Sequence, residues 1–394
     1  MDVWQDLPLV IRGRIGMNTD NIVAALRGSN RICNVDLMLH GWQLENVLTA
    51  TQAPFPELTA LGLRTFTNGE TMPVIPDSFM GRSAPHLRHI MLLGIPFPGL
   101  SNLLLSAARL ADLRLQNIPH SGYISPETIV ALISQLSHLE TLHLLFGSPQ
   151  SRPDPRVTTR PPPPSNRSII PALHSIHFKG AIEYLEDLVT AIDTPRLDKL
   201  YIRFFNQIDF NTPRLNQFIG RTPKLGKRVA TVLFFDDFAG VELSPATLQI
   251  GISCGESDWQ LSSIEQVCNS SSHPLSTVEV LYIEHHYSKL VWKDDAIENT
   301  LWLELLLPYT AVKDLYLCKE FAPGIAVALK ELNGGRITEV LPSLENIFVK
   351  ELEPSGPFRE KIGHFAAARQ LSEDSDRPIA ISDWDGHRKL MTWS

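Results

Sequence analysis

Cysteine is scarce in this sequence, and the four that occur are far apart. Cys33, Cys254, Cys268 and Cys318 form no CxxC unit, since the nearest two are fourteen positions apart. This spacing is unfavourable for a disulfide framework and for a cysteine zinc site, so we expect four reduced thiols in the core. The GxGxxG, Walker and HExxH motifs are also missing. We therefore predict no cofactor and no metal.

Long hydrophobic runs and an excess of positive charge are missing as well. No run approaches the roughly 20 apolar residues of a membrane span, and the residues after Met1 lack the apolar centre of a secretory signal. The sequence has 35 Lys and Arg against 43 Asp and Glu, a net charge of -8, which argues against nucleic-acid binding. We expect a cytoplasmic or nuclear protein without membrane or nucleic-acid partners.

A short pattern recurs instead: an apolar residue, two free positions, an apolar residue, one free position and a third apolar residue. Copies follow one another at intervals of about 23 to 34 residues, a range that overlaps the leucine-rich repeats. The last two apolar residues of each copy alternate with polar ones, as a half-buried strand requires. The clearest copies, with a Pro two places ahead, are Leu58-Leu61-Leu63, Leu87-Ile90-Leu92 and Leu197-Leu200-Ile202, and Leu173-Ile176-Phe178 and Leu344-Ile347-Val349 match as well. Copies without the Pro are Ile32-Val35-Leu37, Leu110-Leu113-Leu115, Leu139-Leu142-Leu144, Val278-Leu281-Ile283 and Val312-Leu315-Leu317.

Helical periodicity fills most of the intervals between these strands. One helix is predicted to begin after Ser125 as N-cap, with Pro126 in its first position. Others are expected at 20–27, 44–51, 100–108, 182–192, 214–220, 259–267, 299–307, 324–332 and 358–370. The fold class is therefore α/β, a leucine-rich-repeat-like solenoid with parallel strands on one face and helices on the other. A doubly wound sheet would need continuous apolar strands and glycine-rich first turns, which the sequence lacks.

Three segments depart from the repeat within what we interpret as a single solenoid over residues 1–394. Residues 147–168 are rich in Pro and Arg and are predicted to form an inserted loop. Leu248, Ile250 and Ile252 alternate out of step with the repeats, which indicates a strand that pairs with 229–235 as a hairpin or a degenerate repeat. Residues 356–394 are predicted to cap the C-terminal end.

The free positions of the strands are expected to line a concave face together. This face is basic and rich in histidine first and aromatic towards the C-terminus, and Tyr, Phe and Arg are residue types that anchor interfaces. The predicted protein-binding residues are Arg64, His89, Arg114, His143, His177, Lys179, Tyr201, Arg203, Tyr282, Tyr316 and Phe348. We predict a binding scaffold and no enzyme. Its protein target is unknown, and an acidic segment of that target would bind against Arg114, Lys179 and Arg203.

An enzymatic alternative rests on one motif. Gly251-Ile252-Ser253-Cys254-Gly255 matches the GxSxG nucleophile elbow, which lies between a strand and a helix. A serine hydrolase would use Ser253 with an acid and a histidine such as Asp294 and His364. His285 and His286 adjoin Glu284, but neighbouring residues of a strand point to opposite faces, so a metal site is not expected there.

Several stretches resemble the fungal, mushroom-type F-box proteins with a leucine-rich-repeat-like C-terminal region. The stretches that carry the resemblance, which covers nearly the whole chain, are 4–9, 258–263, 275–283, 310–317 and 365–371. The resemblance implies a substrate receptor of a ubiquitin ligase, in which an F-box binds the cullin-ligase adaptor and the repeats present a target. Here Leu7-Pro8 is followed by strand-like residues and not by the three helices of an F-box. We therefore do not expect the adaptor to bind this sequence.

Overall fold

The computed structural model describes most of the chain as two compact units. Unit 1 comprises Met1–Phe205 with Arg221–Lys224, and unit 2 comprises Asn206–Gly220 with Leu225–Ser394. The described residues are 7–14, 16–65, 72–97, 100–149, 166–206, 210–225, 228–245, 247–254, 257–270, 275–286, 296–332, 336–351, 357–371 and 378–385. Most of the predicted loop at 147–168 lies outside them, and the single solenoid over 1–394 stays a prediction.

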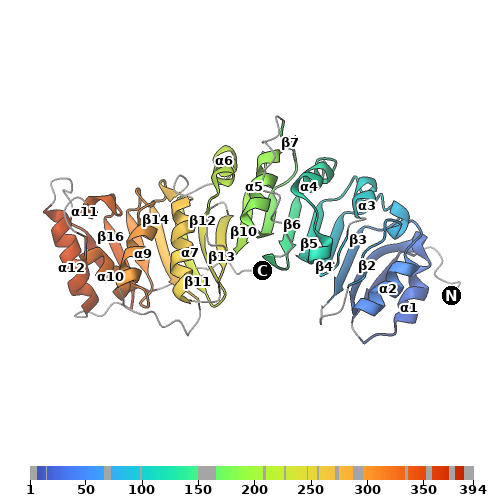
Figure 1. Cartoon of the computed structure of the whole chain (residues 1–394), viewed down its shortest axis with the longest axis horizontal. Coiled ribbons are helices and arrows are strands. Elements are labelled where there is room, and N and C mark those ends of the chain that lie inside the picture. The colour runs from blue at the N-terminus through green and yellow to red at the C-terminus, as the bar shows by residue number, and fades with distance from the viewer. Residues whose placement is uncertain are drawn as a thin grey trace. The chain divides into compact units, whose positions relative to one another are not determined.

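Unit 1 alternates strands and helices around a parallel sheet (Figure 1). Its strands follow in the order β1 (Leu9–Gly13), β2 (Ile32–Leu39), β3 (Ala60–Thr65), β4 (His89–Leu93), β5 (Asp112–Ile118), β6 (Thr141–Phe146), β8 (Ser175–Gly180) and β10 (Lys199–Phe205). Every neighbouring pair is parallel. The short strands β7 (Ser168–Ile169) and β9 (Ile192–Asp193) form a second, two-stranded parallel sheet.

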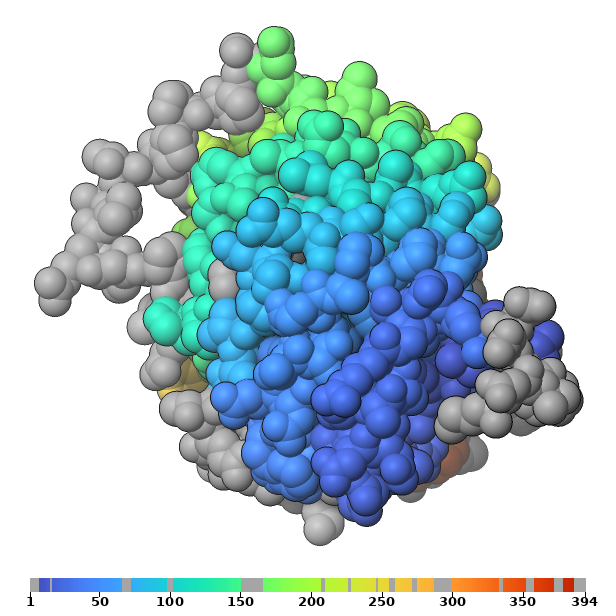
Figure 2. All heavy atoms as spheres, turned by 90° about the vertical axis from the view of Figure 1, so that its right-hand side faces the viewer, coloured from blue at the N-terminus to red at the C-terminus, as the bar shows by residue number. Residues whose placement is uncertain are grey.

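The helices of unit 1 connect these parallel strands. They are α1 (Thr19–Leu26), α2 (Gly41–Ala50), α3 (Leu100–Ser106), α4 (Pro126–Ile133) and α5 (Ile182–Ala191), with short 3-10 helices at Ser29–Arg31, Phe79–Arg82 and His120–Gly122. The predicted start of α4 is confirmed, because the Ser125 hydroxyl accepts a hydrogen bond from the backbone N–H of Thr128. Neighbouring helices pack together, α1 on α2 and α4 on α5. Figure 2 looks onto the N-terminal end of this unit, where the colours pass from blue to green as the repeats follow one another.

The repeat pattern explains the core of unit 1. Its two alternating apolar positions form two rows across the strands, and all of these side chains are at most 2% exposed. The rows are Val35, Leu61, Ile90, Leu113, Leu142, Ile176 and Leu200, and Leu37, Leu63, Leu92, Leu115, Leu144, Phe178 and Ile202. Burial of one such side chain stabilises the fold by about 1.5–3 kcal/mol.

A recurring hydrogen-bond arrangement joins each repeat to the one before it. The backbone N–H groups of Ala111 and Asp112 both donate to the carbonyl oxygen of Arg88, at 2.9 and 3.0 Å. The same shared acceptor recurs where β6, β8 and β10 begin, at the carbonyls of Ala111, Glu140 and His174. Each strand thus starts at a position set by the preceding strand, which keeps the side-chain rows aligned.

Unit 2 contains a parallel part and an antiparallel part. Its strands lie in the order β13 (Thr247–Ser253), β12 (Phe238–Ser244), β11 (Val229–Phe235), β14 (Val280–His285), β15 (Asp314–Leu317), β16 (Asn346–Lys350) and β17 (Ala380–Trp384). From β11 to β17 the pairs are parallel. The helices are α6 (Pro213–Arg221), which ends at the unit boundary, α7 (Ser257–Ser270), α9 (Ala296–Leu306), α10 (Ala322–Lys330), α11 (Arg336–Glu339) and α12 (Pro357–Gln370).

The antiparallel part differs from the predicted hairpin. β13 does pair within an antiparallel group, but its partner there is β12, and β12 in turn pairs with β11. β12 was not predicted, because Ala239 and Gly240 interrupt its apolar pattern and both residues are unfavourable in strands. Three antiparallel strands thus replace the expected two.

The observed alternation of strand and helix shows the predicted fold class, a leucine-rich-repeat-like α/β solenoid. The antiparallel pairs β11–β12 and β12–β13 depart from its parallel repeat. All ten predicted helices are present, with ends that differ by one to a few residues. The cysteines are free, and three of the four are buried. In unit 2, β17 lies at the edge of the sheet beside β16 within the segment predicted to be a cap. Its role as a cap stays a prediction.

Candidate functional site

The candidate site is the open face of each sheet, the face to which the free strand positions point. In β3 the buried residues Leu61, Leu63 and Thr65 alternate with the half-buried Ala60, Gly62 and Arg64. The strand registers align such free positions into rows. The central row of unit 1 is Arg12, Asp36, Gly62, Met91, Arg114, His143, His177 and Tyr201.

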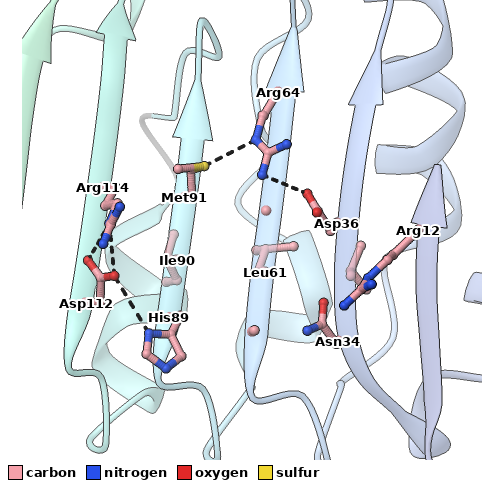
Figure 3. Close-up of a pocket in the computed structure, with 13 residues that line it drawn as sticks. Arg12, Asn34, Asp36, Leu61, Arg64, His89, Ile90, Met91, Asp112 and Arg114 are labelled. Carbon is pink, nitrogen blue, oxygen red and sulfur yellow. Dashed lines mark hydrogen bonds and ion pairs between the residues drawn. The ribbon is translucent and has the colours of Figure 1, made fainter. Parts of the chain in front are cut away.

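Carboxylates neutralise part of the basic character that the sequence predicts for this face. Arg114 Nε donates to both carboxylate oxygens of Asp112, at 3.0 and 2.9 Å. Arg64 Nη2 forms an ion pair with Asp36 Oδ1 at 3.1 Å, and among the described residues this buried oxygen accepts no hydrogen bond. His89 Nδ1 lies 3.8 Å from Asp112 Oδ2. Figure 3 shows the Arg114–Asp112 pair within β5, and the Arg64–Asp36 and His89–Asp112 pairs between neighbouring strands.

Three rings of the central row form a continuous stack. The His143 and His177 rings lie 3.9 Å apart at 11°, and His177 lies 4.3 Å from Tyr201 at 21°. Burial, reinforced by the positive charge of Arg114, lowers the pKa of His143 to about 4. Burial, together with His143, Arg114 and Lys199, lowers the pKa of His177 to about 3. Both rings are neutral at pH 7, so the histidines of this stack add flat stacking surface and no positive charge.

Acidification from pH 7 to pH 5 is expected to destabilise unit 1 by about 2 kcal/mol through these two rings. In the unfolded chain both histidines bind a proton near pH 6.5, whereas the folded rings stay neutral down to about pH 4 and 3. The unfolded state therefore binds more protons in this window, and stability is lost as the pH falls below 6.5. The full shift at pH 5 corresponds to about 2 kcal/mol per ring, roughly halved here for solvent screening.

Urea unfolding at pH 7, 6 and 5 measures this dependence. His177→Phe keeps a stacking ring and should reduce the loss of stability on acidification. His138→Phe alters an exposed histidine outside the stack and should keep the full loss. Equal pH dependence in the wild type and in His177→Phe would rule out the stacked pair as its source.

Lys179 and Arg203 form part of the row beside the central row. The registers place them opposite one another on β8 and β10. The Lys179 ammonium lies 5.6 Å from the centre of the Phe205 ring, a cation–π contact. With Arg64 and His89, all eight predicted residues of unit 1 occupy open-face positions of its sheet.

The open face of unit 2 carries an aromatic row, which we define as Tyr282, Tyr316, Phe348 and Trp384. The Tyr282 and Tyr316 rings stack at 4.4 Å, and Tyr316 and Phe348 do so at 4.4 Å. Trp384 lies 5.3 Å from Tyr316 and nearly perpendicular to it, and 5.7 Å from Tyr282. The registers of β14, β15 and β16 bring the three predicted rings together.

Polar groups flank the aromatic row on both sides along the strands. Asn346 Nδ2 donates to Asp314 Oδ1 at 2.7 Å on the side where the strands begin. On the other side Glu284 is only 7% exposed, and His286 Nε2 lies 3.6 Å from its carboxylate. The row is thus an aromatic surface with polar edges, which is the composition of an interface centre and its rim.

The rings of His285 and His286, at the end of β14, point in different directions, as predicted for neighbouring residues of a strand. The His285 ring contacts Phe321 at 5.8 Å, and His286 stacks on Phe235 at 5.1 Å. Among the described residues, no group of three or more His, Cys, Asp or Glu side chains is arranged to hold a metal ion.

The GxSxG motif has a structural explanation in β13. Gly251 faces Gly240 on the neighbouring strand, and the ring of Phe238 lies across both glycines, so that a Cβ on Gly251 would be 2.2 Å from Phe238 Cζ. β13 pairs antiparallel with β12, whereas a nucleophile elbow follows a strand of a parallel sheet. His364 belongs to α12, which follows β16, five strands away or roughly 24 Å at the usual strand spacing. Asp294 and Gly255 lie outside the described residues.

Sequence reasoning did not select several residues that lie beside the predicted ones. Arg12, Asp36, Gly62 and Met91 share the central row with Arg114. Asp36 is a free position of the pattern Ile32-Val35-Leu37, so the repeat itself contained the signal. Trp384 carries no such signal, because only the fold of the C-terminal segment brings its ring to Tyr316.

Comparisons with known proteins add little to these findings. No known family model matches the sequence, and no curated protein matches it. Among solved structures, the chain is similar to the leucine-rich repeat-containing protein LegL7 from Legionella pneumophila, with 12% identity over 91% of this chain and 98% of that chain and a TM-score of 0.32. A TM-score of this size carries no argument, so the fold assignment rests on the registers and buried rows described above. In the described part of the chain, no helix has the length and apolarity needed to cross a membrane.

Proposed function

We propose that this protein is a recognition scaffold that binds another protein through its open strand faces, without catalysing a reaction. The observation that carries the proposal is the aromatic row, in which three stacked rings and a perpendicular Trp384 lie half-buried on a strand face. Aromatic side chains in such positions supply most of the binding energy in protein interfaces. Four adjacent rings on an open face offer a partner one continuous aromatic surface.

The basic positions of unit 1 support an acidic segment as part of the partner. Arg114, Lys179 and Arg203 come from β5, β8 and β10 and lie on one face. Arg114 donates to Asp112 through Nε alone, and within the described ranges its two terminal nitrogens form no hydrogen bond. Charge complementarity of this kind accelerates association and selects the partner.

Charge reversal tests the acidic-segment proposal. The triple variant Arg114→Glu, Lys179→Glu and Arg203→Glu should weaken binding of a partner captured by the wild type at least tenfold. It should also remove most of the decrease in association rate that added salt causes. An unchanged affinity in this variant would refute the acidic segment.

The resemblance to F-box proteins supports a finer proposal, in which the bound protein is a target for ubiquitination. This proposal rests on the resemblance alone. If it is right, depletion of the chain from its native cell should lengthen the lifetime of the captured partner, and restoring the chain should shorten it again. If the lifetime of the partner does not change, the ubiquitination proposal is refuted, whereas the proposed binding scaffold is unaffected.

A further inference from the structure

The central row of unit 1 contains one position without a side chain. Gly62 lies between Asp36 on β2 and Met91 on β4, and its backbone forms the floor of a hollow of about 250 Å³ that extends over β1 to β5. Ala60 and Arg64 bound the hollow along β3 itself. Figure 3 shows Arg12, Arg64 and Arg114 around this floor. A hollow of this volume is large enough to receive a side chain of a bound segment.

The hydrogen-bonding groups around the hollow are incompletely used. Arg12 forms no hydrogen bond or ion pair within the described part of the chain, although it lies opposite Asp36 in the register. Arg64 uses Nε towards Met91 Sδ and Nη2 towards Asp36, and Arg114 uses only Nε. Guanidinium N–H groups of all three arginines are thus left for a ligand.

The charges of the lining favour an anion. Three arginines face two carboxylates, those of Asp36 and Asp112, and both carboxylates already have an arginine beside them. The positive charge of Arg12 is the one that is not compensated. A planar guanidinium binds a carboxylate through two parallel hydrogen bonds, which gives both strength and geometry.

We propose that the hollow at Gly62 receives an acidic side chain, Glu or Asp, from an extended segment of the bound protein. This inference rests on the proposed function and names one anchor of the partner. The carboxylate would bind between Arg12 and the terminal nitrogens of Arg64 and Arg114, while the aliphatic part of the side chain contacts Met91 and Ala60. Gly62 is required because any side chain at this position occupies the space itself: its Cβ alone would lie 3.0 Å from Asp36 Oδ1.

Fluorescence anisotropy with a labelled hexaglutamate peptide tests the hollow on the whole chain. Gly62→Leu fills the space without changing the charge, and Arg12→Gln removes the uncompensated charge without filling it. Each variant should weaken hexaglutamate binding at least tenfold. Arg27→Gln is the matched control, because Arg27 is an exposed arginine at the end of α1 away from the strand face, and its loss should change the affinity less than twofold.

The outcomes separate this anchor from the scaffold as a whole. Equal weakening by Arg12→Gln and Arg27→Gln would mean general charge attraction, and full binding by Gly62→Leu would mean that the space is not used; either result overturns the proposal. A phosphoserine peptide that binds at least tenfold more tightly than hexaglutamate would overturn the assignment to a carboxylate. If Gly62→Leu binds the captured partner normally while Tyr316→Ala does not, the proposed anchor in the hollow is refuted, whereas the proposed binding scaffold is supported. If neither variant weakens binding of that partner, both the anchor in the hollow and the binding scaffold are refuted.

Discussion

Replacement of Gly251 by Ala is expected to destabilise unit 2 by about 1–3 kcal/mol, the usual cost of overpacking a tight site. The added methyl group would lie 2.2 Å from Phe238 Cζ and 2.6 Å from the carbonyl oxygen of Ala239. The backbone cannot yield without disturbing the pairing of β12 and β13, and the Phe238 ring is 3% exposed and has little room to turn. Urea unfolding monitored by circular dichroism should show a lower midpoint for the variant.

Two companion variants sharpen this result. Gly363→Ala lies in α12, where a Cβ meets nothing within 4 Å, and should stabilise the protein by up to about 1 kcal/mol through helix propensity. Gly251→Ala should cost less in a Phe238→Leu background, because the two side chains compete for one space. Wild-type stability in Gly251→Ala would contradict the packing of Phe238 over the two glycines. The GxSxG motif would then lack this structural explanation, and a role of Ser253 as a nucleophile would have to be tested.

The second large effect is expected at Tyr316, the middle ring of the aromatic row. Tyr316→Ala removes stacking contacts with two neighbours and the perpendicular contact with Trp384. Truncating an aromatic anchor at the centre of an interface costs about 2 kcal/mol or more of binding free energy, a loss of roughly 30-fold in affinity. The lost ring contacts should also lower the stability of unit 2 by about 1–2 kcal/mol, which leaves the fold intact because Tyr316 is half-buried on the open face and outside the hydrophobic core.

Isothermal titration calorimetry with the captured partner measures this loss. Trp259→Ala is the matched control, because Trp259 is a 58% exposed aromatic residue on α7 and not on a strand. Its truncation should leave the affinity within about twofold of the wild type. A loss in Trp259→Ala as large as in Tyr316→Ala would place the interface on the helices.

The repeat itself could be predicted from the sequence because its physical basis is local. An apolar residue at every second position of a short strand gives a buried row, and the intervals between copies are long enough for one helix each. The open-face positions of Tyr282, Tyr316 and Phe348 follow from the same alternation. Their stacking follows from the register, which the shared hydrogen bonds at the strand starts determine.

Features that depend on contacts between distant segments could not be predicted. In the unpredicted strand β12, Phe238 covers Gly240 and also Gly251 of β13, a contact that no periodic pattern reports. The neutral state of His143 depends on its burial and on the charge of Arg114, which together lower its pKa, whereas the sequence shows only a histidine at an open position. The hollow at Gly62 is the space of a missing side chain. It becomes a candidate anion site only because the fold brings Arg12 and Arg114 beside it from other strands.

Photo-crosslinking from matched positions tests most directly whether the open face binds the partner. A photoreactive residue replaces either Lys350, exposed at the open face of β16 beside the aromatic row, or Lys330, exposed at the end of α10. The same partner should be crosslinked from position 350 and not from position 330, and Tyr316→Ala should abolish the product. Crosslinking from position 330 alone, or a product at 350 that survives Tyr316→Ala, would contradict recognition through the strand face.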